Sequence, residues 1–376
     1  MPRKNLLPLQ GKPLITHTIE HARFATMVTK VVVSTDDPEI ASTAEAAGAQ
    51  AILRPSELAS DTATSESALS HALQVLDQQE HFIPDVVLFL QCTSPVRKPS
   101  DVDNAIAALT TAGADSLVSV VRWPRFLWRS QNGVAAPMNY DPVHRPRSQD
   151  MEGQFLENGS IYAFRPWVLR QYNSRLGGKI GIYEMDFWSS FEIDTIEDLE
   201  ICRWILEKQA DHDREKALPH PVHAIFFDFD GVFTNNMVLT LQDGTEGILA
   251  DRRDGYGIGL LRAAGVFAGV LSTERNPVVA ARCTKMGIPL HQGLDNKLQA
   301  LVRLAEANKL DLKHVMYVGN DLNDLECIQA VGCGIAVADA HPSVRAAARV
   351  VLQCKGGYGA VREVCELVLS RMHRNA

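Results

Sequence analysis

The stretch Ile225-Phe226-Phe227-Asp228-Phe229-Asp230-Gly231 leads from an apolar run into two carboxylates and a glycine. An apolar run of this length is typical of a buried strand, whose side chains alternate between the two faces of the sheet. Asp228 and Asp230 therefore point to the same side, at the carboxyl end where open parallel sheets bind their ligands. Two carboxylates this close repel each other unless a cation lies between them, and Mg²⁺ prefers such oxygen ligands.

This carboxylate pair suits phosphoryl transfer. An ionised aspartate beside Mg²⁺ can attack a phosphoryl group while the second carboxylate moves a proton. A strand that ends in two capping aspartates before a loop is the plainer alternative, so the context of the pair has to decide. Three further strands, at 265–271, 315–319 and 334–337, each end in polar residues and are expected to reach the same edge.

The composition limits the possible function classes. The chain has 376 residues, an apolar fraction of 46% and a net charge of −8, which predicts two domains with full cores. There is no long basic run, so nothing indicates a nucleic-acid partner. The seven cysteines are scattered and form no C-x-x-C pair, which favours reduced thiols in a cytoplasmic protein. Neither a secretory signal nor an apolar run of roughly 18 residues is found, so no membrane partner is expected.

Strands and helices alternate in both halves, which predicts two α/β domains of Rossmann-like, three-layer architecture. A charged segment at 211–222 follows a helix expected at 196–208 and is the predicted linker, so the domains are 1–210 and 223–376. Residues 123–147 lose the pattern and are rich in proline and arginine, which indicates a lid or a binding loop. In the first half a parallel sheet is expected, with strands at 30–35, 49–53, 85–91, 116–121, 158–164 and 191–194.

The second half resembles the haloacid dehalogenase superfamily of phosphotransferases, and within it the small capless phosphatases of 3-deoxy-octulosonate and nonulosonate phosphates. The likeness covers residues 224–369. So many matches in order predict family membership far more strongly than the carboxylate pair alone. The motifs that carry it are Asp228–Thr234, Arg253–Ile258, Ser272, Gln292–Gly293 with Lys297, Gly319–Asp321, Ala338–Pro342 and Gly356–Cys365.

The resemblance implies a role for each member of the second site. Asp228 would be the nucleophile and Asp230 the general acid and base. Ser272 would hydrogen-bond the phosphate, and Lys297 would balance its charge. Catalysis of this type works by positioning and charge neutralisation.

The metal motif of the second half departs from the usual pattern. Phosphatases of this family usually have an aspartate after Gly319, whereas this chain has Asn320. An amide oxygen can ligate Mg²⁺ but brings no negative charge, so a weaker ion site is expected unless Asp321 or Asp324 compensates. A fold retained for oligomerisation, with little turnover, is the alternative. The predicted metal ligands are Asp228, Asp230, Asn320 and Asp321.

The first half looks like the N-acylneuraminate cytidylyltransferases, the CMP-sialic acid synthetases, which have a GT-A-like nucleotidyltransferase fold. The likeness covers nearly all of residues 1–205. Animal-type enzymes of this family are fused to a half that resembles a sugar-acid phosphatase, as the second half here does. The motifs that carry it are Ser34–Asp37 with Arg54–Ser65, Leu90–Arg97, Gln149–Asp150, Glu157–Tyr162 and Glu192–Asp194.

The implied reaction is attack of a sugar 2-hydroxyl on the α-phosphate of CTP, with release of pyrophosphate. Such chemistry needs cations near the triphosphate. The residues implied for the nucleotide are Lys4, Asn5, Arg54 and Ser65. Those implied for the sugar pocket are Gln91, Asn158 and Tyr162, with Arg147 available for the sugar carboxylate. The residues implied for Mg²⁺ are Glu192 and Asp194.

Several of these residues also have a plainer interpretation. Lys4 and Arg54 can be surface cations, Gln91 can cap a turn at a strand end, and Tyr162 can be a core aromatic. Each assignment therefore depends on whether the fold brings the residue to a shared site.

Three departures weaken the resemblance of the first half. Family members begin with an apolar strand and a phosphate-binding loop, whereas residues 1–5 correspond to the inside of that loop, so a gap in the sheet is expected. We expect a start assigned too late and an impaired transferase in the chain as written. The arginine that usually precedes Gln149 is Ser148, and the first metal ligand is Glu192 in place of an aspartate.

The sequence thus predicts a fused enzyme, cytidylyltransferase first and phosphatase or phosphatase-like domain second. Its expected ligands are CTP, a sialic acid-type sugar acid, a sugar-acid phosphate and Mg²⁺, and a homo-oligomer, dimer or tetramer, is expected. One alternative is a sugar-acid phosphate phosphatase with a non-catalytic first half. Another is a cytidylyltransferase for a relative of sialic acid such as 3-deoxy-octulosonate.

Overall fold

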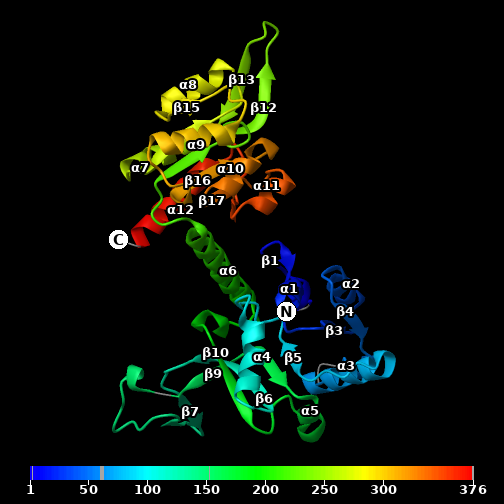
Figure 1. Ribbon diagram of the computed structural model, residues 1–376. Helices are drawn as coiled ribbons and strands as arrows, with labels where there is room; N and C mark the ends of the chain where they lie inside the picture. The colour runs from blue at the N-terminus through cyan, green and yellow to red at the C-terminus, as the bar shows by residue number, and fades with distance from the viewer. Residues whose placement is uncertain (2, 60–62, 152, 375–376) are drawn as a thin grey trace. The chain divides into compact units, whose positions relative to one another are not determined.

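The computed structural model describes residues 1, 3–59, 63–151 and 153–374. Residues 60–62 of the Arg54–Ser65 motif lie outside the described residues. The chain divides into two compact units, Met1–Glu207 and Lys208–Ala376 (Figure 1).

The helix expected at 196–208 is longer in the structure. Helix α6 runs from Ile196 to Ala217 and so includes part of the expected linker 211–222. Arg214 forms ion pairs with Asp211 at 2.5 Å and with Glu363 at 2.9 Å. These pairs stabilise a segment whose charge run has no apolar period, which is why its helical structure was not predicted.

A six-stranded parallel sheet forms the centre of the second unit, in the order β15-β14-β11-β16-β17-β18. Strand β11 pairs with β14 on one side and β16 on the other. Its four apolar residues are fully buried, as expected for a strand covered on both faces. The strands are β11 (Ala224–Phe227), β14 (Phe267–Leu271), β15 (Leu290–His291), β16 (Val315–Gly319), β17 (Cys333–Ala336) and β18 (Val350–Val351).

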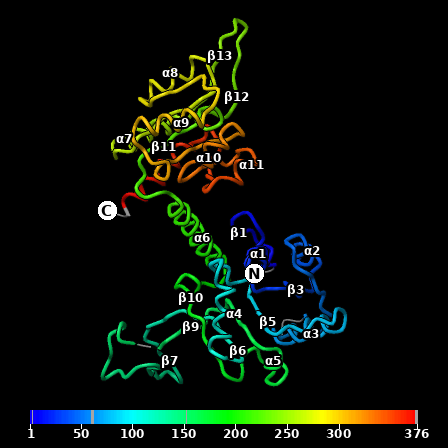
Figure 2. Tube along the Cα trace, viewed as in Figure 1, coloured from blue at the N-terminus to red at the C-terminus, as the bar shows by residue number. Residues whose placement is uncertain are grey.

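The helices of the second unit share one large core with this sheet. Strands β12 (Thr234–Thr240) and β13 (Glu246–Ala250) form an antiparallel hairpin. It extends away from the core, in green in Figure 2. The helices are α7 (Arg252–Ala263), α8 (Pro277–Met286), α9 (Lys297–Ala307), α10 (Leu325–Ala330), α11 (Pro342–Ala347) and α12 (Ala360–Arg374), with the 3-10 turns η5 (Leu312–His314) and η6 (Leu322–Asp324).

The first unit contains a four-stranded sheet in the order β10-β6-β9-β5 and a separate parallel pair, β3-β4. Two short hairpins, β1-β2 and β7-β8, complete its strands. The strands are β1 (Pro8–Leu9), β2 (Lys12–Pro13), β3 (Val32–Thr35), β4 (Gln50–Leu53), β5 (Val87–Leu90), β6 (Ser116–Arg122), β7 (Trp128–Gln131), β8 (Val134–Pro137), β9 (Phe155–Phe164) and β10 (Ile180–Met185).

The helices of the first unit surround several smaller cores instead of one. Helix α1 packs its apolar face against the β3-β4 pair, and α4 packs against the four-stranded sheet. The helices are α1 (Leu14–Phe24), α2 (Pro38–Ala46), α3 (Ser65–Glu80), α4 (Asp101–Thr111) and α5 (Pro166–Tyr172), with the 3-10 turns η1 (Lys4–Leu6), η2 (Ser56–Leu58), η3 (Ser148–Asp150) and η4 (Phe187–Ser190).

The larger sheet of the first unit is mixed, which differs from the parallel sheet expected. Strand β9 runs antiparallel to both β5 and β6. After the 123–154 connection, the chain runs back along β6 in the opposite direction. The strand expected at 191–194 is also wrong: this segment is extended and is fixed by the Ile193 amide, which donates to the Thr93 carbonyl at 2.7 Å. Strand β10 takes the sheet edge instead, in parallel with β6.

The expected interruption of the first sheet is seen in the strand pairing. In the described part of the first unit, β3 pairs only with β4, and β5 pairs only with β9. Residues 4–6 form the turn η1 before the short β1-β2 hairpin. Of the helices in the described part of the chain, none combines the length and the apolar character needed to cross a bilayer.

Candidate active sites

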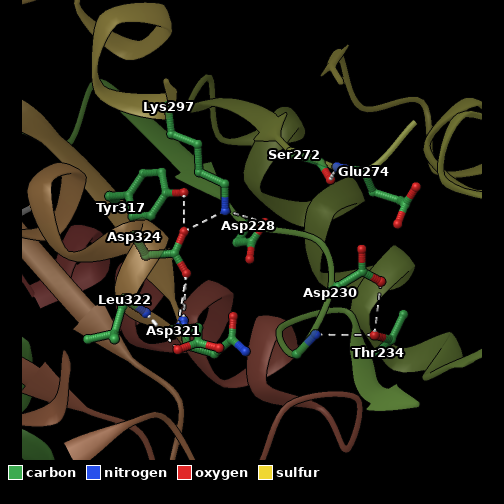
Figure 3. Close-up of polar contacts among 12 residues, drawn as sticks. Asp228, Asp230, Thr234, Ser272, Glu274, Lys297, Tyr317, Asp321, Leu322 and Asp324 are labelled. Atoms are coloured by element: carbon green, nitrogen blue, oxygen red, sulfur yellow. Dashed lines mark hydrogen bonds and ion pairs between the residues drawn. The ribbon is translucent and has the colours of Figure 1, made fainter. Parts of the chain in front are cut away.

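The second unit holds a buried lysine between two carboxylates (Figure 3). Asp228 follows β11, Lys297 begins α9, and Asp324 ends η6. Lys297 Nζ lies 2.8 Å from Asp228 Oδ1 and 2.7 Å from Asp324 Oδ1. All three side chains are almost completely buried, at 1%, 7% and 0% exposure. One cation therefore balances two anions in a region with little exposure to water.

Asp324 has little capacity left for a further ligand. Its Oδ1 accepts a hydrogen bond from the Tyr317 hydroxyl at 2.8 Å, in addition to the Lys297 ion pair. Its Oδ2 accepts from the backbone amides of Asn320 at 2.9 Å and Asp321 at 3.2 Å. Asp324 therefore holds Lys297 and the loop after β16 in place. Sequence reasoning did not find Tyr317, because it stands within the apolar run of a strand.

The pKa values of this centre are shifted by burial and by the excess of two carboxylates over one lysine. Burial raises the pKa of Asp228 and the Asp324 charge adds to the effect, whereas Lys297 opposes it. Burial lowers the pKa of Lys297, but Asp228 and Asp324 together raise it above its ordinary value. Burial, followed by the charge of Glu274, raises the pKa of Asp230. A carboxyl with a raised pKa is suited to donate a proton near neutral pH.

A cavity of about 360 Å³ opens beside this centre. Asp230 lies across it from Ser272 and accepts a long hydrogen bond, 3.5 Å, from Thr234 Oγ1. Ser272 Oγ accepts from the Glu274 amide at 3.0 Å, which orients the hydroxyl at the end of β14. Residues from three strand ends, from the hairpin and from the start of α8 line the cavity: Asp228, Asp230, Asn236, Met237, Val238, Glu246, Ile248, Ser272, Thr273, Glu274, Asn276, Val278, Val279, Asn320, Asp321 and Asn323.

In the second site the carboxylates of Asp228 and Asp230 line the cavity together with the Asn320 amide, a set that can ligate Mg²⁺ through oxygen but carries one charge fewer than three carboxylates. Among the described residues, no group of three or more His, Cys, Asp or Glu side chains could hold a metal ion. Asn320 stands where a third carboxylate is usual in the family. Asp321 is exposed, and its Oδ1 accepts from the Leu322 amide at 2.7 Å as the cap of η6. Since Asp324 is also committed, neither acid replaces the missing charge.

In the first unit, the structure brings Lys4 together with the predicted metal ligands. Lys4 Nζ lies 3.0 Å from Asp194 Oδ1. Glu192 and Gln91 both lie against Gly159: a Cβ at this glycine would stand 2.4 Å from Glu192 Oε1 and 2.9 Å from Gln91 Oε1. Gly159 also has a positive φ of 62°, so only glycine fits both the backbone and the space.

The charged residues of this group affect the titration of Glu192, although the described part of the chain has no set of three or more His, Cys, Asp or Glu side chains placed to hold a metal ion. Burial raises the pKa of Glu192, and the charges of Asp194 and Glu157 raise it further, whereas Lys4 lowers it. The carboxylates thus repel one another with one lysine nearby. Glu192 and Asp194 fit Mg²⁺ as oxygen donors. Glu157 was not predicted, although it stands one residue before the predicted Asn158.

Two predicted sugar-pocket residues are buried in the sheet. Asn158 Oδ1 accepts from Ser119 Oγ at 2.6 Å, and its Nδ2 donates to Ser189 Oγ at 2.9 Å. Tyr162 is 3% exposed, and its hydroxyl donates to Glu157. Burial, followed by the Glu157 hydrogen bond, raises the pKa of Tyr162 to about 12. Both side chains thus have internal partners, and their contact with a sugar stays a prediction.

The remaining predicted residues are more scattered. Arg54 Nη2 lies 3.3 Å from Asp36 Oδ1. Asn5 is in η1, Ser65 is the first residue of α3, and Arg147 is an exposed residue before η3. Their roles in binding the nucleotide and the sugar stay predictions.

Two arginines of the first unit make structural contacts that the sequence did not reveal. Arg175 stacks 4.3 Å from the centre of the Tyr162 ring and pairs with Glu66 at 2.8 Å. Arg97 is 5% exposed and donates to the carbonyl oxygens of Gln91 at 2.6 Å and Ser160 at 2.9 Å. It therefore joins the end of β5 to β9. The Leu90–Arg97 motif contained Arg97, but no spacing rule gave its contacts.

These two sites define a class of protein, a nucleotidyltransferase-type unit followed by a phosphatase-type unit. The family model described as cytidylyltransferase matches residues 1–217. That of a haloacid dehalogenase-like hydrolase matches residues 288–363. N-acylneuraminate cytidylyltransferase A of Danio rerio is 32% identical over an alignment of 377 positions, which covers 98% of this chain and 85% of the relative. The chain therefore belongs to the N-acylneuraminate cytidylyltransferase family, with a haloacid dehalogenase-like second half.

Relatives of the second half alone are also found. A 3-deoxy-D-manno-octulosonate 8-phosphate phosphatase of Escherichia coli (strain K12) is 37% identical over 149 residues, 39% of this chain and 79% of that protein. A solved phosphatase of the same name from Moraxella catarrhalis is 31% identical and covers 44% of this chain and 92% of that one, with a TM-score of 0.40. That crystal structure contains magnesium, phosphate and a KDO molecule.

Proposed function

We propose that the first unit transfers CMP from CTP to an N-acylneuraminate or a related nonulosonate and releases pyrophosphate. The observation that carries this proposal is the meeting of Lys4 with Asp194 at 3.0 Å, beside Glu192, although Lys4 and Asp194 are 190 residues apart. Nucleotidyl transfer requires a cation for the phosphates and carboxylates for a metal ion. The cytidylyltransferase relatives support the choice of substrates.

In this reaction the sugar 2-hydroxyl oxygen bonds to the α-phosphorus and releases its proton to the solvent, and the bond from that phosphorus to pyrophosphate breaks. Lys4 binds the phosphates, and Arg97 fixes the backbone on which Gln91 faces the sugar. Glu192 and Asp194 would hold Mg²⁺, which neutralises phosphate charge when bound.

The test measures pyrophosphate release from CTP, Mg²⁺ and N-acetylneuraminate. Lys4→Met and Asp194→Asn are each expected to lower the rate by about tenfold or more. The ion pair of Lys98 with Asp186, at 2.6 Å, offers matched controls, and Lys98→Met and Asp186→Asn are expected to keep the parent rate. Equal losses in both pairs would contradict the assignment.

The choice of sugar is tested in the same assay. Replacing N-acetylneuraminate by 3-deoxy-octulosonate separates the two cytidylyltransferase alternatives. If no nonulosonate supports pyrophosphate release, the first unit is a non-catalytic module and the transferase proposal is wrong.

For the second unit we propose a site for the phosphate monoester of a sugar acid. The buried Lys297 between Asp228 and Asp324 supports it. Asp228 would attack the phosphorus and break the ester bond, while Asp230 gives its proton to the leaving alkoxide. Water would then hydrolyse the aspartyl-phosphate after losing a proton to Asp230.

Release of inorganic phosphate from a sugar-acid phosphate tests this second site. Asp228→Asn is expected to abolish the release, and the exposed Asp295→Asn serves as its control. If the parent protein and Asp228→Asn release phosphate at the same rate, the second unit does not catalyse this hydrolysis through Asp228. A cytoplasmic location and a homo-oligomeric state stay predictions.

A further inference from the structure

Arg175 contacts two parts of the first unit that carry predicted substrate residues. It stands in the connection between α5 and β10. Its Cζ lies 4.3 Å from the centre of the Tyr162 ring and 5.3 Å from the centre of the Phe89 ring. Its Nη1 lies 2.8 Å from Glu66 Oε1. Only 22% of the Arg175 side chain and 17% of the Glu66 side chain are exposed, so solvent screens this ion pair less than an exposed pair.

The aromatic contacts of Arg175 belong to the predicted sugar pocket. Tyr162 is a predicted sugar residue, and Phe89 stands two positions before Gln91, which is another. The centroids of the Phe89 and Tyr162 rings are 6.0 Å apart, so one guanidinium lies over both rings. A planar guanidinium stacks on aromatic faces in a way that a lysine ammonium does not. Arg175 therefore links β5 and β9 at the aromatic side of this pocket.

The ion pair of Arg175 belongs to the predicted nucleotide side. Glu66 is in the first turn of α3, directly after Ser65, which is a predicted nucleotide residue. The backbone beside Arg175 is fixed to β6, because the Gly177 amide donates to Ser116 Oγ at 3.0 Å and this hydroxyl donates to the Gly177 carbonyl at 2.8 Å. Arg175 thus holds the start of α3 from a fixed position on the sheet.

We propose that Arg175 is a positioning residue of the cytidylyl transfer, which sets the Tyr162 side of the sugar pocket against the start of α3. This inference rests on the proposed function of the first unit. Arg175 acts through Tyr162 on the sugar and through Glu66 on the nucleotide. The two connections differ in chemistry, since the ion pair needs only a positive charge whereas the stacking needs the planar guanidinium. They can therefore be broken separately.

The test measures pyrophosphate release while CTP and N-acetylneuraminate are varied in turn, which gives a KM for each. Arg175→Met removes both connections and is expected to raise both KM values by about threefold to tenfold. Arg175→Lys keeps a charge for Glu66 and is expected to raise the KM for the sugar alone. Glu66→Gln keeps the stacking on Tyr162 and is expected to raise the KM for CTP alone.

Arg170→Met is the matched control, because Arg170 is an exposed arginine of the neighbouring helix α5. It is expected to change each KM by less than about twofold. A general loss of stability lowers the fraction of active enzyme and therefore kcat, but it does not divide the KM effects between the two substrates. The opposite selectivity of Arg175→Lys and Glu66→Gln is thus the result that a merely structural role would not produce.

The possible outcomes separate this inference from the proposed function. If Arg175→Lys and Glu66→Gln change the same KM values, or if Arg175→Met behaves like Arg170→Met, the inference is wrong. If circular dichroism shows Arg175→Met unfolded, the comparison of Arg175→Lys with Glu66→Gln decides by the same criterion.

A parent protein that releases no pyrophosphate contradicts the proposed function instead. Calorimetric titration with CTP then tests the inference without turnover. Weaker binding by Glu66→Gln than by Arg175→Lys supports the inference, and equal binding by the two variants counts against it.

Discussion

At the scale of single residues, Lys297 decides the stability of the second site. Its removal leaves Asp228 and Asp324 as buried anions without a cation. Lys297→Met is therefore expected to lower the free energy of unfolding of the second unit by about 3–5 kcal/mol. Urea unfolding followed by circular dichroism measures the change.

The exposed Lys313→Met is the control for this prediction and should change stability by less than about 0.5 kcal/mol. In the double variant Lys297→Met/Asp324→Asn, one of the two unpaired carboxylates is also removed. This variant is expected to recover part of the lost stability. If Lys297→Met is as stable as Lys313→Met, the ion pairs of Lys297 do not stabilise the second unit.

At the scale of secondary-structure elements, Asp254 joins α7 to the start of α12. It is completely buried, and its Oδ1 accepts from the Arg362 amide at 3.0 Å. Burial raises the pKa of Asp254 from 3.8 to about 7. Between about pH 4 and pH 7 the folded protein thus keeps a proton that the unfolded chain releases, and this contribution to stability is lost as the pH rises.

Asp254→Asn is therefore expected to stabilise the second unit at pH 8, by about 1–3 kcal/mol, and to give no gain at pH 4. The amide keeps the acceptor for Arg362 and cannot ionise. Urea unfolding at both pH values measures this crossover. The exposed Asp295→Asn is the control and should change stability little at either pH. If Asp254→Asn changes stability by the same amount at pH 4 and pH 8, the titration of Asp254 is not the cause.

The elements also show how far the sequence could predict this molecule. Strand β16 matches the expected 315–319, because a short run that is almost wholly apolar and ends at a glycine is typical of a buried strand. The direction of β9 depends on pairing partners far along the chain, which no local pattern encodes. For the same reason, the sequence indicated Asp228, Asp230, Ser272 and Lys297 but not Tyr317, whose contact with Asp324 depends on packing.

At the scale of the whole molecule, the described apolar cores fall within one unit or the other. The large core of the second unit runs from Ala217 to Met372, and the smaller cores of the first unit lie between Leu7 and Leu206. Since cooperative unfolding follows a shared core, two transitions are expected in denaturant. Each should respond only to substitutions in its own unit.

Arg97 and Lys297 allow this to be tested, because each is a buried cation of a different unit. Arg97→Met removes donors from the carbonyls of Gln91 and Ser160 and is expected to cost the first transition about 1–3 kcal/mol. Lys297→Met should shift only the second transition, and the double variant should show the sum of the two effects. A single transition that moves with either substitution would mean that the two units unfold together, and the sites would then have to be treated as energetically coupled.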